Sequence, residues 1–469
     1  VCVSGPTEIQ SHWFKNLAPG EAFESVPVAV GVADDSFEQA MGELTRYRRM
    51  IRRPNKDDEE LPVIFNDYMN CLFGDPTTEK ELPLIDAAAA CGCEYYVIDA
   101  GWYAPGEWWD SVGEWKECRD RFPNGIKEVT DYIRKKGMVP GVWLELEVMG
   151  INCEKAKKAP DDWFFVRHGK RVYDRSRYQL DFRNPAVIEH VNEVIDRVVK
   201  EYGVGYIKMD YNIEPGIGTE IGAESVGQGL LEHEKAYLNW LDGVFARYPD
   251  LVIENCSSGG LRMDYALLSR YSIQSTSDQE DYRNFATIAA NSPAGVTPEQ
   301  AAIWSYPMRQ GDKEEVIYNM VNAMLFRIHQ SGHLAELSQE RLALVKEGIA
   351  CYKTIRQDIR QALPFWPLDI ADNEDLWVCG GLQLENKAYL AVWKRQMEGK
   401  NNDRYQNAGI SCTEDSLSIP LGNLPFAGKG LKVSCLYPEK EPVSFELDKD
   451  ILTVHYDKPV MARLFEISF

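Results

Sequence analysis

The sequence predicts an α/β protein in which a (β/α)8 TIM barrel is followed by a C-terminal antiparallel β-sandwich. From about residue 60 to 310, short β-rich runs alternate with longer helix-patterned ones, which is typical of parallel strands covered by helices. Up to eight such units follow one another, and this number favours a closed barrel over an open sheet. After residue 362 the pattern changes to short alternating runs with turn signals, as in an antiparallel sandwich.

Three segments follow from this reading. Residues 1–55 carry extended runs and then a helix pattern up to Arg53, so we expect the tail of an N-terminal β-domain with a linking helix. Residues 56–362 form the predicted catalytic barrel, and residues 363–469 form the predicted sandwich. The first residue is Val1 and not Met, so we expect that an upstream segment is missing.

The predicted barrel strands end in polar side chains. The strand runs are PVIFNDYM, YYVIDAGWY, VPGVWLELE, YQLDF, GYIKMDY, LVIENCSSGG, YSIQSTSD and AIWSYP. Their polar ends are Asp67, Asp99, Glu145, Glu147, Asp181, Asp210, Asn255 and Asp278. Active sites of such barrels lie at the C-terminal strand ends, so the pattern predicts a mouth lined by carboxylates.

Composition narrows the classes of partner. A formal net charge of −22 would repel nucleic acid and anionic lipid, and no apolar run approaches the roughly 20 residues that span a bilayer. We therefore expect neither nucleic acid nor a membrane as partner. Eleven cysteines, an odd number spread along the chain, favour a reducing, cytoplasmic location over secretion, although the missing upstream segment leaves a signal peptide open.

We predict no cofactor and no metal. The chain has seven histidines, and a metal-dependent hydrolase would need ligands clustered at strand ends. His168, His190, His233, His329 and His333 are instead expected on loops or helices.

Two aspartates could carry glycosidic chemistry. A retaining glycosidase needs one ionised and one protonated carboxyl, about 5 to 5.5 Å apart. Asp210 ends YIKMD, with Lys208 on the same face of the strand, and a nearby ammonium favours the ionised form that a nucleophile needs. Asp278 ends SIQSTSD and could be kept protonated by a neighbouring carboxylate. Spacing alone leaves helix capping as an equal alternative for both.

Taken together, the motifs resemble glycoside hydrolase family 36, the α-galactosidase family, across nearly the whole chain. The family's nucleophile strand YVKWDMN is similar to YIKMDYN, and its CSGGGGRFD and QIWTSDDTD blocks are similar to CSSGGLRMD and QSTSDQED. FPNGI, GVWLELE and LDFRNP also match family patterns. The resemblance implies that Asp210 is the nucleophile and Asp278 the general acid/base.

The resemblance also implies a set of sugar-binding residues. These are Tyr68, Asp99, Trp115, Arg175, Lys208, Cys256 and Gly259. The alternative for Trp115 is a core residue, and Arg175, between Arg171 and Arg177, could equally lie on a solvated face.

One departure affects the substrate. The family's second strand ends in two aspartates that hold O4 and O6 of galactose, whereas this chain has Asp99 followed by Ala100. The usual tryptophans of three strands are replaced by Tyr68, Met209 and Ser275.

We therefore predict a retaining exo-α-glycosidase for terminal α-linked galactose-type sugars, acting on an oligosaccharide or glycoconjugate. The alternatives are an α-N-acetylgalactosaminidase or α-galactosaminidase with the same mechanism, a transglycosylase, and a carbohydrate-binding barrel without activity. A homo-oligomer is compatible with the family resemblance.

Overall fold

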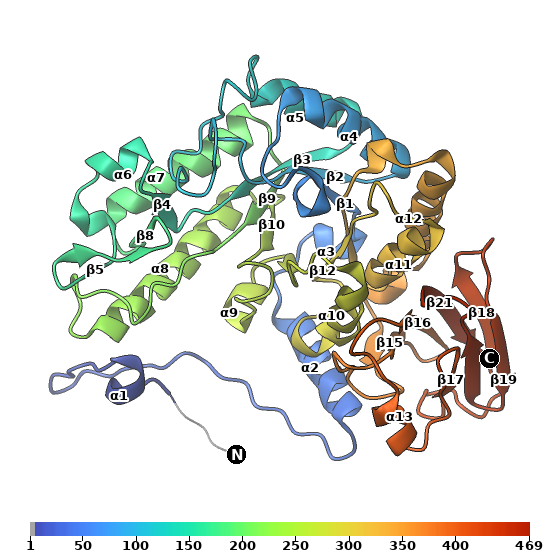
Figure 1. Cartoon of the computed structure of the whole chain (residues 1–469). Coiled ribbons are helices and arrows are strands. Elements are labelled where there is room, and N and C mark those ends of the chain that lie inside the picture. Colours follow the sequence, from blue (N-terminus) through green and yellow to red (C-terminus); the bar gives the residue numbers. More distant parts are fainter. Residues whose placement is uncertain (1–4) are drawn as a thin grey trace.

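Eight parallel strands close into a barrel in the order β1-β13-β12-β11-β10-β9-β3-β2 in the computed structural model, which describes residues 5–469 (Figure 1). The barrel strands are β1 (Ile64–Asn66), β2 (Tyr95–Ile98), β3 (Val139–Leu144), β9 (Tyr206–Met209), β10 (Val252–Asn255), β11 (Ile273–Ser275), β12 (Ala301–Ser305) and β13 (Arg327–Gln330). The predicted barrel is thereby confirmed. Val1, from which the missing upstream segment was inferred, lies outside the described residues.

One predicted barrel strand was wrong, and one real strand was not predicted. The run YQLDF contributes to β8 (Arg177–Gln179), which pairs antiparallel with β4 (Val148–Gly150) and β7 (Tyr173–Asp174). These three strands form a separate small sheet, and they lie between β3 and β9 in the sequence. The barrel is closed instead by β13, between β12 and β1. This also corrects the expectation for His329, which lies on a barrel strand and is fully buried.

Strand β13 has the sequence Arg-Ile-His-Gln and is nevertheless buried throughout. At its start Arg327 makes a bidentate ion pair with Asp57, with N···O distances of 2.8 and 2.9 Å. Gln330, at its end, donates to the backbone carbonyl of Ser305. These partners satisfy part of the polar surface of the strand, whereas both ring nitrogens of His329 have no hydrogen-bond partner among the described residues.

Helices surround the barrel (Figure 1). They are α3 (Asp57–Glu60), α4 (Thr78–Cys91), α5 (Ile126–Lys135), α6 (Glu154–Lys158), α7 (Pro185–Asp196), α8 (Val226–Arg247), α9 (Tyr265–Leu268), α10 (Tyr282–Gly295), α11 (Lys313–Ala323) and α12 (Gln339–Ile359). Several start at a polar cap; Ser225 before α8 accepts from the N–H of Gln228, and Asp312 before α11 accepts from that of Glu315. Such caps satisfy N–H groups that have no partner within the helix.

Two antiparallel sheets form the predicted C-terminal sandwich, which is confirmed. The larger contains β14 (Leu363–Phe365), β15 (Trp377–Gln383), β16 (Lys387–Arg395), β21 (Val460–Ser468) and β18 (Lys432–Tyr437), and the smaller β17 (Ser416–Pro420), β20 (Ile451–His455) and β19 (Ser444–Asp448). Their inner faces share a core that includes Trp377, Leu417 and Phe465. Figure 1 shows the sandwich beside α10 and α11, where Arg463 of β21 pairs with Glu314 of α11 at 2.8 Å.

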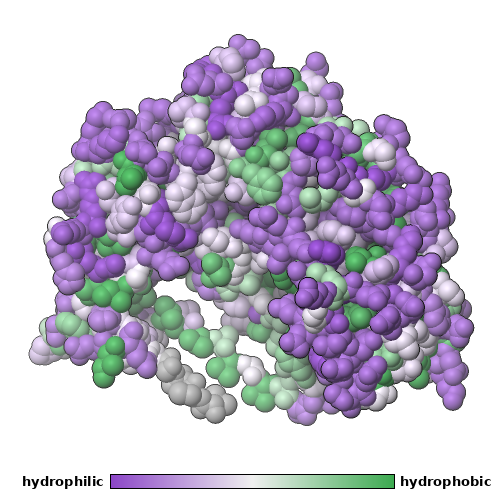
Figure 2. Space-filling view, in the orientation of Figure 1, coloured by the Kyte–Doolittle hydropathy of each residue, from purple (hydrophilic) through white to green (hydrophobic). Residues whose placement is uncertain are grey.

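The segment before the barrel is extended. Within residues 5–36 the only regular element is α1 (Glu8–Ser11), and the segment docks near α8, where the N–H of Phe14 donates to Ser225 at 2.9 Å. The linking helix is α2 (Phe37–Ile51). Val26, Val28, Val30 and Val32 are all exposed, and Figure 2 shows hydrophobic residues along the lower edge of the molecule. That this segment is the tail of a β-domain stays a prediction.

No helix among residues 5–469 combines the length and the apolar character needed to cross a membrane.

Candidate active site

Asp210 follows strand β9 at the C-terminal mouth of the barrel, and three N–H groups hold its carboxylate. The indole Nε1 of Trp143 donates to Oδ2 at 3.0 Å, and the backbone N–H groups of Tyr211 and Ser258 donate to Oδ1 at 2.8 and 3.3 Å. Asp210 is buried, with 8% of its surface exposed. These donors fix the orientation of the carboxylate, as a nucleophile requires.

Asp278 lies three residues beyond strand β11, next to the loop that contains Gly259, and its side chain is exposed at the mouth. Partial removal of water around its carboxyl raises its pKa to about 6, against the influence of Lys208 and with the further repulsion of Asp210 and Asp99. A carboxyl with this pKa can carry a proton near neutral pH, as a general acid requires.

Gly259 connects the two aspartates. Its φ of +80° lies in the left-handed region, and its backbone pairs with Ser277. A Cβ at this position would lie 2.7 Å from the Cα of Ser277 and 2.8 Å from the backbone nitrogen of Asp278. Glycine therefore permits the loop that donates to Asp210 to approach the strand end that carries Asp278.

Lys208 and Asp99 form a buried ion pair below the two aspartates. The ammonium of Lys208 lies 2.9 Å from Oδ2 of Asp99, and the amide of Asn66 donates to the same oxygen at 2.6 Å. Burial alone would lower the pKa of Lys208, but Asp99 and further acidic neighbours raise it well above its usual value. The lysine is therefore a permanent positive charge at the base of the site.

Tyr68 and Cys256 complete the surroundings of this pair. The ring centroid of Tyr68 is 5.8 Å from the Lys208 ammonium. Burial raises the pKa of Tyr68 to about 12, with Asp99 as the next cause. Burial also raises the pKa of the Cys256 thiol, followed by the charge of Asp210. Both groups are therefore neutral, and the phenol can donate a hydrogen bond to a ligand.

Trp115 and Arg175 are linked to the surroundings of Asp210 through other residues. Trp115 is 1% exposed and packs on Trp143, with ring centroids 5.7 Å apart, so it supports the indole that contacts Asp210. Arg175 keeps about half of its side chain exposed and donates to the backbone carbonyl of Asn212 at 2.9 Å. The structure places it at the rim.

Trp143 and Arg177 were not among the predicted site residues, and Glu145 was expected only as one of the carboxylates that line the mouth. Trp143 and Glu145 are two residues apart in the β3 run, so both side chains lie on the face that points into the barrel. This spacing could have identified them from the sequence. Glu145 accepts from the N–H of Asn212 at 2.5 Å and pairs with Arg177. Burial raises the pKa of Glu145 to about 7.

Two further strand-end residues belong to a different cluster. Glu147 pairs with Arg262 at 2.6 Å and contacts His233 at 3.1 Å, and Asp181 pairs with Arg183 at 2.6 Å. These contacts tie the β4-β8-β7 sheet and the loop after β10 to helix α8. Asp181 and Glu147 therefore support the wall of the mouth.

A parallel eightfold barrel with carboxylates at its C-terminal mouth is compatible with a glycoside hydrolase, and the family match and the relatives place the chain in this class. The sequence matches the model of the Melibiase family over residues 23–362. The chain belongs to this family, and within it to glycoside hydrolase family 36.

Curated relatives agree with this placement. The chain is 30% identical to the α-galactosidase AgaA of Geobacillus stearothermophilus over 365 residues, which are 73% of this chain and 48% of AgaA. It is 29% identical to the α-galactosidase Mel36A of Lactobacillus acidophilus over 265 residues, 55% of this chain and 36% of Mel36A. The chain thus spans about half or less of the length of these relatives.

Solved structures share the fold. The structure of AgaA from Geobacillus stearothermophilus in complex with raffinose superposes with a TM-score of 0.76 at 21% identity, covering 92% of this chain and 58% of AgaA. The galactosidase domain of AgaSK, an α-galactosidase–sucrose kinase, superposes with a TM-score of 0.73 at 19% identity, with the same coverage of each chain.

Proposed function

We propose that this chain is a retaining exo-α-glycosidase that removes terminal α-linked galactose-type sugars from oligosaccharides. The observation that carries the proposal is the pair of unequal carboxyls at one mouth: Asp210 receives three N–H donors, whereas Asp278 has its pKa raised to about 6. Retaining chemistry needs this combination of an ionised nucleophile and a protonated acid.

The proposed reaction has two displacements. Asp210 attacks the anomeric carbon, the bond to the leaving oxygen breaks, and Asp278 gives its proton to that oxygen. A water molecule then gives a proton to Asp278 and attacks the anomeric carbon, which releases Asp210. Two inversions leave the anomeric configuration unchanged.

The sugar would be held by the groups below and beside the two aspartates. Asp99 and Lys208 offer a charged acceptor and a charged donor, and Tyr68 adds a neutral hydroxyl. Gly259 lets the backbone approach the ring. Trp115 and Arg175 would act at longer range, the first by supporting Trp143 and the second at the rim.

The relatives support the substrate class. AgaA and Mel36A are named α-galactosidases, and AgaA variants have been solved with raffinose and with stachyose. Ala100, buried beside Asp99, removes one carboxylate that the family uses for galactose. Because of this difference, α-linked N-acetylgalactosamine and α-linked galactosamine are the second candidates for the substrate.

The test is a panel of aryl α-glycosides with galactose, N-acetylgalactosamine, galactosamine and glucose, assayed with the wild type and with Asp210→Asn. We expect turnover of one galactose-configured member and its loss in the variant. Galactoside binding without product release over days would favour a binding protein, and full activity of Asp210→Asn would disprove the nucleophile assignment.

A second experiment tests retention directly. NMR of the first-formed product should show the α-anomer, which later mutarotates. A β-anomer would require a water-activating base in place of a nucleophile and would overturn the double displacement.

We also propose that the chain works in a reducing compartment such as the cytoplasm, because the ten cysteines among residues 5–469 are all free. Recovery of the native protein from culture medium, with its thiols oxidised, would contradict this.

A further inference from the structure

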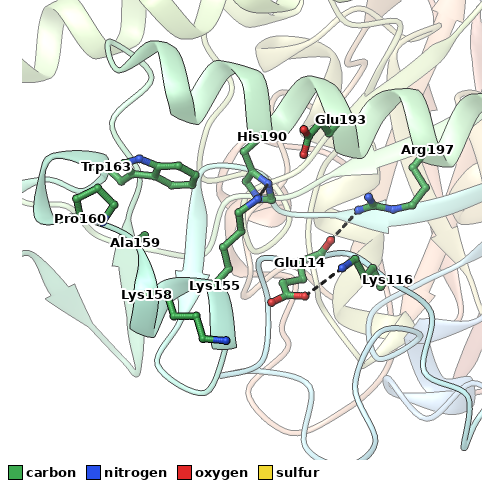
Figure 3. A pocket seen from close by; sticks show the side chains of 10 residues that line it. All are labelled: Glu114, Lys116, Lys155, Lys158, Ala159, Pro160, Trp163, His190, Glu193 and Arg197. Atoms are coloured by element: carbon green, nitrogen blue, oxygen red, sulfur yellow. Dashed lines mark hydrogen bonds and ion pairs between the residues drawn. The ribbon is translucent and has the colours of Figure 1, made fainter.

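A second cavity lies outside the barrel mouth, between helix α6 with the turn Asp161–Trp163, helix α7 with its extension Arg197–Glu201, and the loop that carries Glu114 (Figure 3). Its volume is about 450 Å³, within the range of small-molecule sites. The lining residues are Glu114, Lys116, Lys155, Lys158, Ala159, Pro160, Trp163, His190, Glu193 and Arg197. None of them belongs to the candidate active site.

This cavity is basic although the chain is strongly acidic. Four cationic side chains face two carboxylates, on a chain with a net charge of −22. Lys116 lies 3.6 Å from Glu114 and Lys158 lies 3.9 Å from Glu154, whereas Lys155 makes no ion pair with any residue between 5 and 469. The cavity therefore offers an uncompensated positive charge, which favours an anionic ligand.

His190 holds Lys155 in place. Its Nδ1 lies 2.8 Å from the Lys155 ammonium, and its Nε2 lies 2.8 Å from the backbone carbonyl of Gly113. Burial, followed by the charge of Lys155, lowers the pKa of His190 to about 4. The imidazole is thus neutral at physiological pH, so it accepts from the ammonium and adds no charge. An ammonium held in this way needs little reorganisation to meet an anion.

The wall next to Lys155 is apolar and aromatic. Ala159, Pro160 and Trp163 form it, and the Lys155 ammonium lies 5.6 Å from the centroid of the Trp163 ring. Glu193 projects from helix α7 toward the same space (Figure 3) and can accept hydroxyl protons. An aromatic face, a carboxylate and a fixed ammonium side by side suit a ring that bears both hydroxyl groups and a negative charge.

We propose that this cavity binds an anionic sugar, with the ring against Trp163 and its phosphate or carboxylate group against Lys155 and Lys158. Its inner wall is the backbone of the loop 113–115: Arg197 donates to the carbonyls of Glu114 and Trp115 at 2.7 and 3.2 Å. The site thus lies behind the loop whose Trp115 supports the candidate active site, and it does not depend on the proposed glycosidase activity.

Calorimetric titration of the full chain tests the proposal, with galactose 6-phosphate, galacturonate, galactose and inorganic phosphate as probes. We expect at least one of the two anionic sugars to bind, and to bind roughly a hundredfold more weakly to Lys155→Met/Lys158→Met, since each of the two hydrogen bonds to a charged group contributes on the order of one decade. Lys135→Met, a change at an exposed lysine of α5, is the matched control and should leave the affinity unchanged. Comparison of the affinities for galactose 6-phosphate and galacturonate shows whether the cavity prefers a phosphate or a carboxylate group.

Three outcomes would overturn the proposal: no binding of either anionic sugar, equal affinity in the double lysine variant, or equal affinity for inorganic phosphate and for the anionic sugar. Lys158→Glu provides a second variant, because Lys158 is largely exposed and its replacement leaves the core intact. It should weaken binding of the anionic sugar and leave galactose binding unchanged.

Discussion

The ammonium of Lys208 on strand β9 lies 2.9 Å from the carboxylate of Asp99 at the end of β2, and both side chains are almost fully buried. Asn66 on β1 donates to the same carboxylate oxygen. Three barrel strands thus contribute to one charge pair directly below the two candidate catalytic aspartates. Removing one member of a buried ion pair costs stability, since the remaining charge stays buried without a partner.

Asp99→Ala should therefore destabilise the fold by about 3–5 kcal/mol, because it leaves the Lys208 charge buried and unpaired. Unfolding in urea measures the loss. The exposed pair of Lys127 and Asp131 is the control, where Asp131→Ala should cost less than about 1 kcal/mol. Asp99→Ala/Lys208→Met should regain part of the stability without regaining activity; a double variant as unstable as the single one would contradict the argument.

Asp278→Ala should affect substrates according to their leaving groups. A nitrophenolate leaves without a proton, whereas the oxygen of a second sugar needs one. We expect the rate of raffinose hydrolysis to fall by about 100-fold or more. For a nitrophenyl α-galactoside, the rate of the first displacement should fall by less. Steady-state kinetics on both substrates checks this. An equal loss on both would show that Asp278 is not the general acid.

The pH dependence follows from the same residue. Asp278, with a pKa raised to about 6, carries its proton below that pH and loses it above. Because the acid form is the active one in the first displacement, kcat/KM for an oligosaccharide should fall as the pH rises through about 6. In Asp278→Ala this alkaline limb should vanish from the residual hydrolysis of the oligosaccharide; an unchanged limb would assign it to another group.

Ala100→Asp tests the missing carboxylate. If the substituted side chain reaches the sugar as the family's second aspartate does, a charged hydrogen bond should raise kcat/KM for α-galactosides by roughly tenfold. Ala100→Asn has the same shape without the charge and should gain less. Equal rates in both variants and the wild type would show that Ala100 does not set the preference, and a loss would mean that the buried position does not accept a second charge near Asp99.

The fold class and the positions of the two aspartates could be predicted because they depend on local pattern. Apolar strands alternate with helices; Asp210 immediately follows strand β9, and Asp278 lies three residues beyond the end of β11. Strand β13 could not be found in this way, since its Arg327, His329 and Gln330 are polar. Their partners, such as Asp57, are distant in sequence and are known only once the barrel is closed.

The run YQLDF was misread for the reverse reason. It has the composition of a barrel strand and lies between β3 and β9 in the sequence. Because β3 and β9 pair directly with each other, no barrel strand can lie between them. The outcome for Arg175 is similar: three arginines lie within seven residues, and only the three-dimensional structure shows that Arg177 is buried against Glu145 while Arg175 lies at the rim.

The hydrogen bond from the indole of Trp143 to Asp210 has a practical consequence for spectroscopy. The proton on this Nε1 is deshielded by a carboxylate, and it would lose most of that influence when the same oxygen atoms become part of an ester. In a sample labelled with 15N at tryptophan, one resonance out of twelve should therefore move when an intermediate accumulates. Trp143→Phe would identify that resonance, so that occupancy of the nucleophile could be followed without a chromogenic substrate.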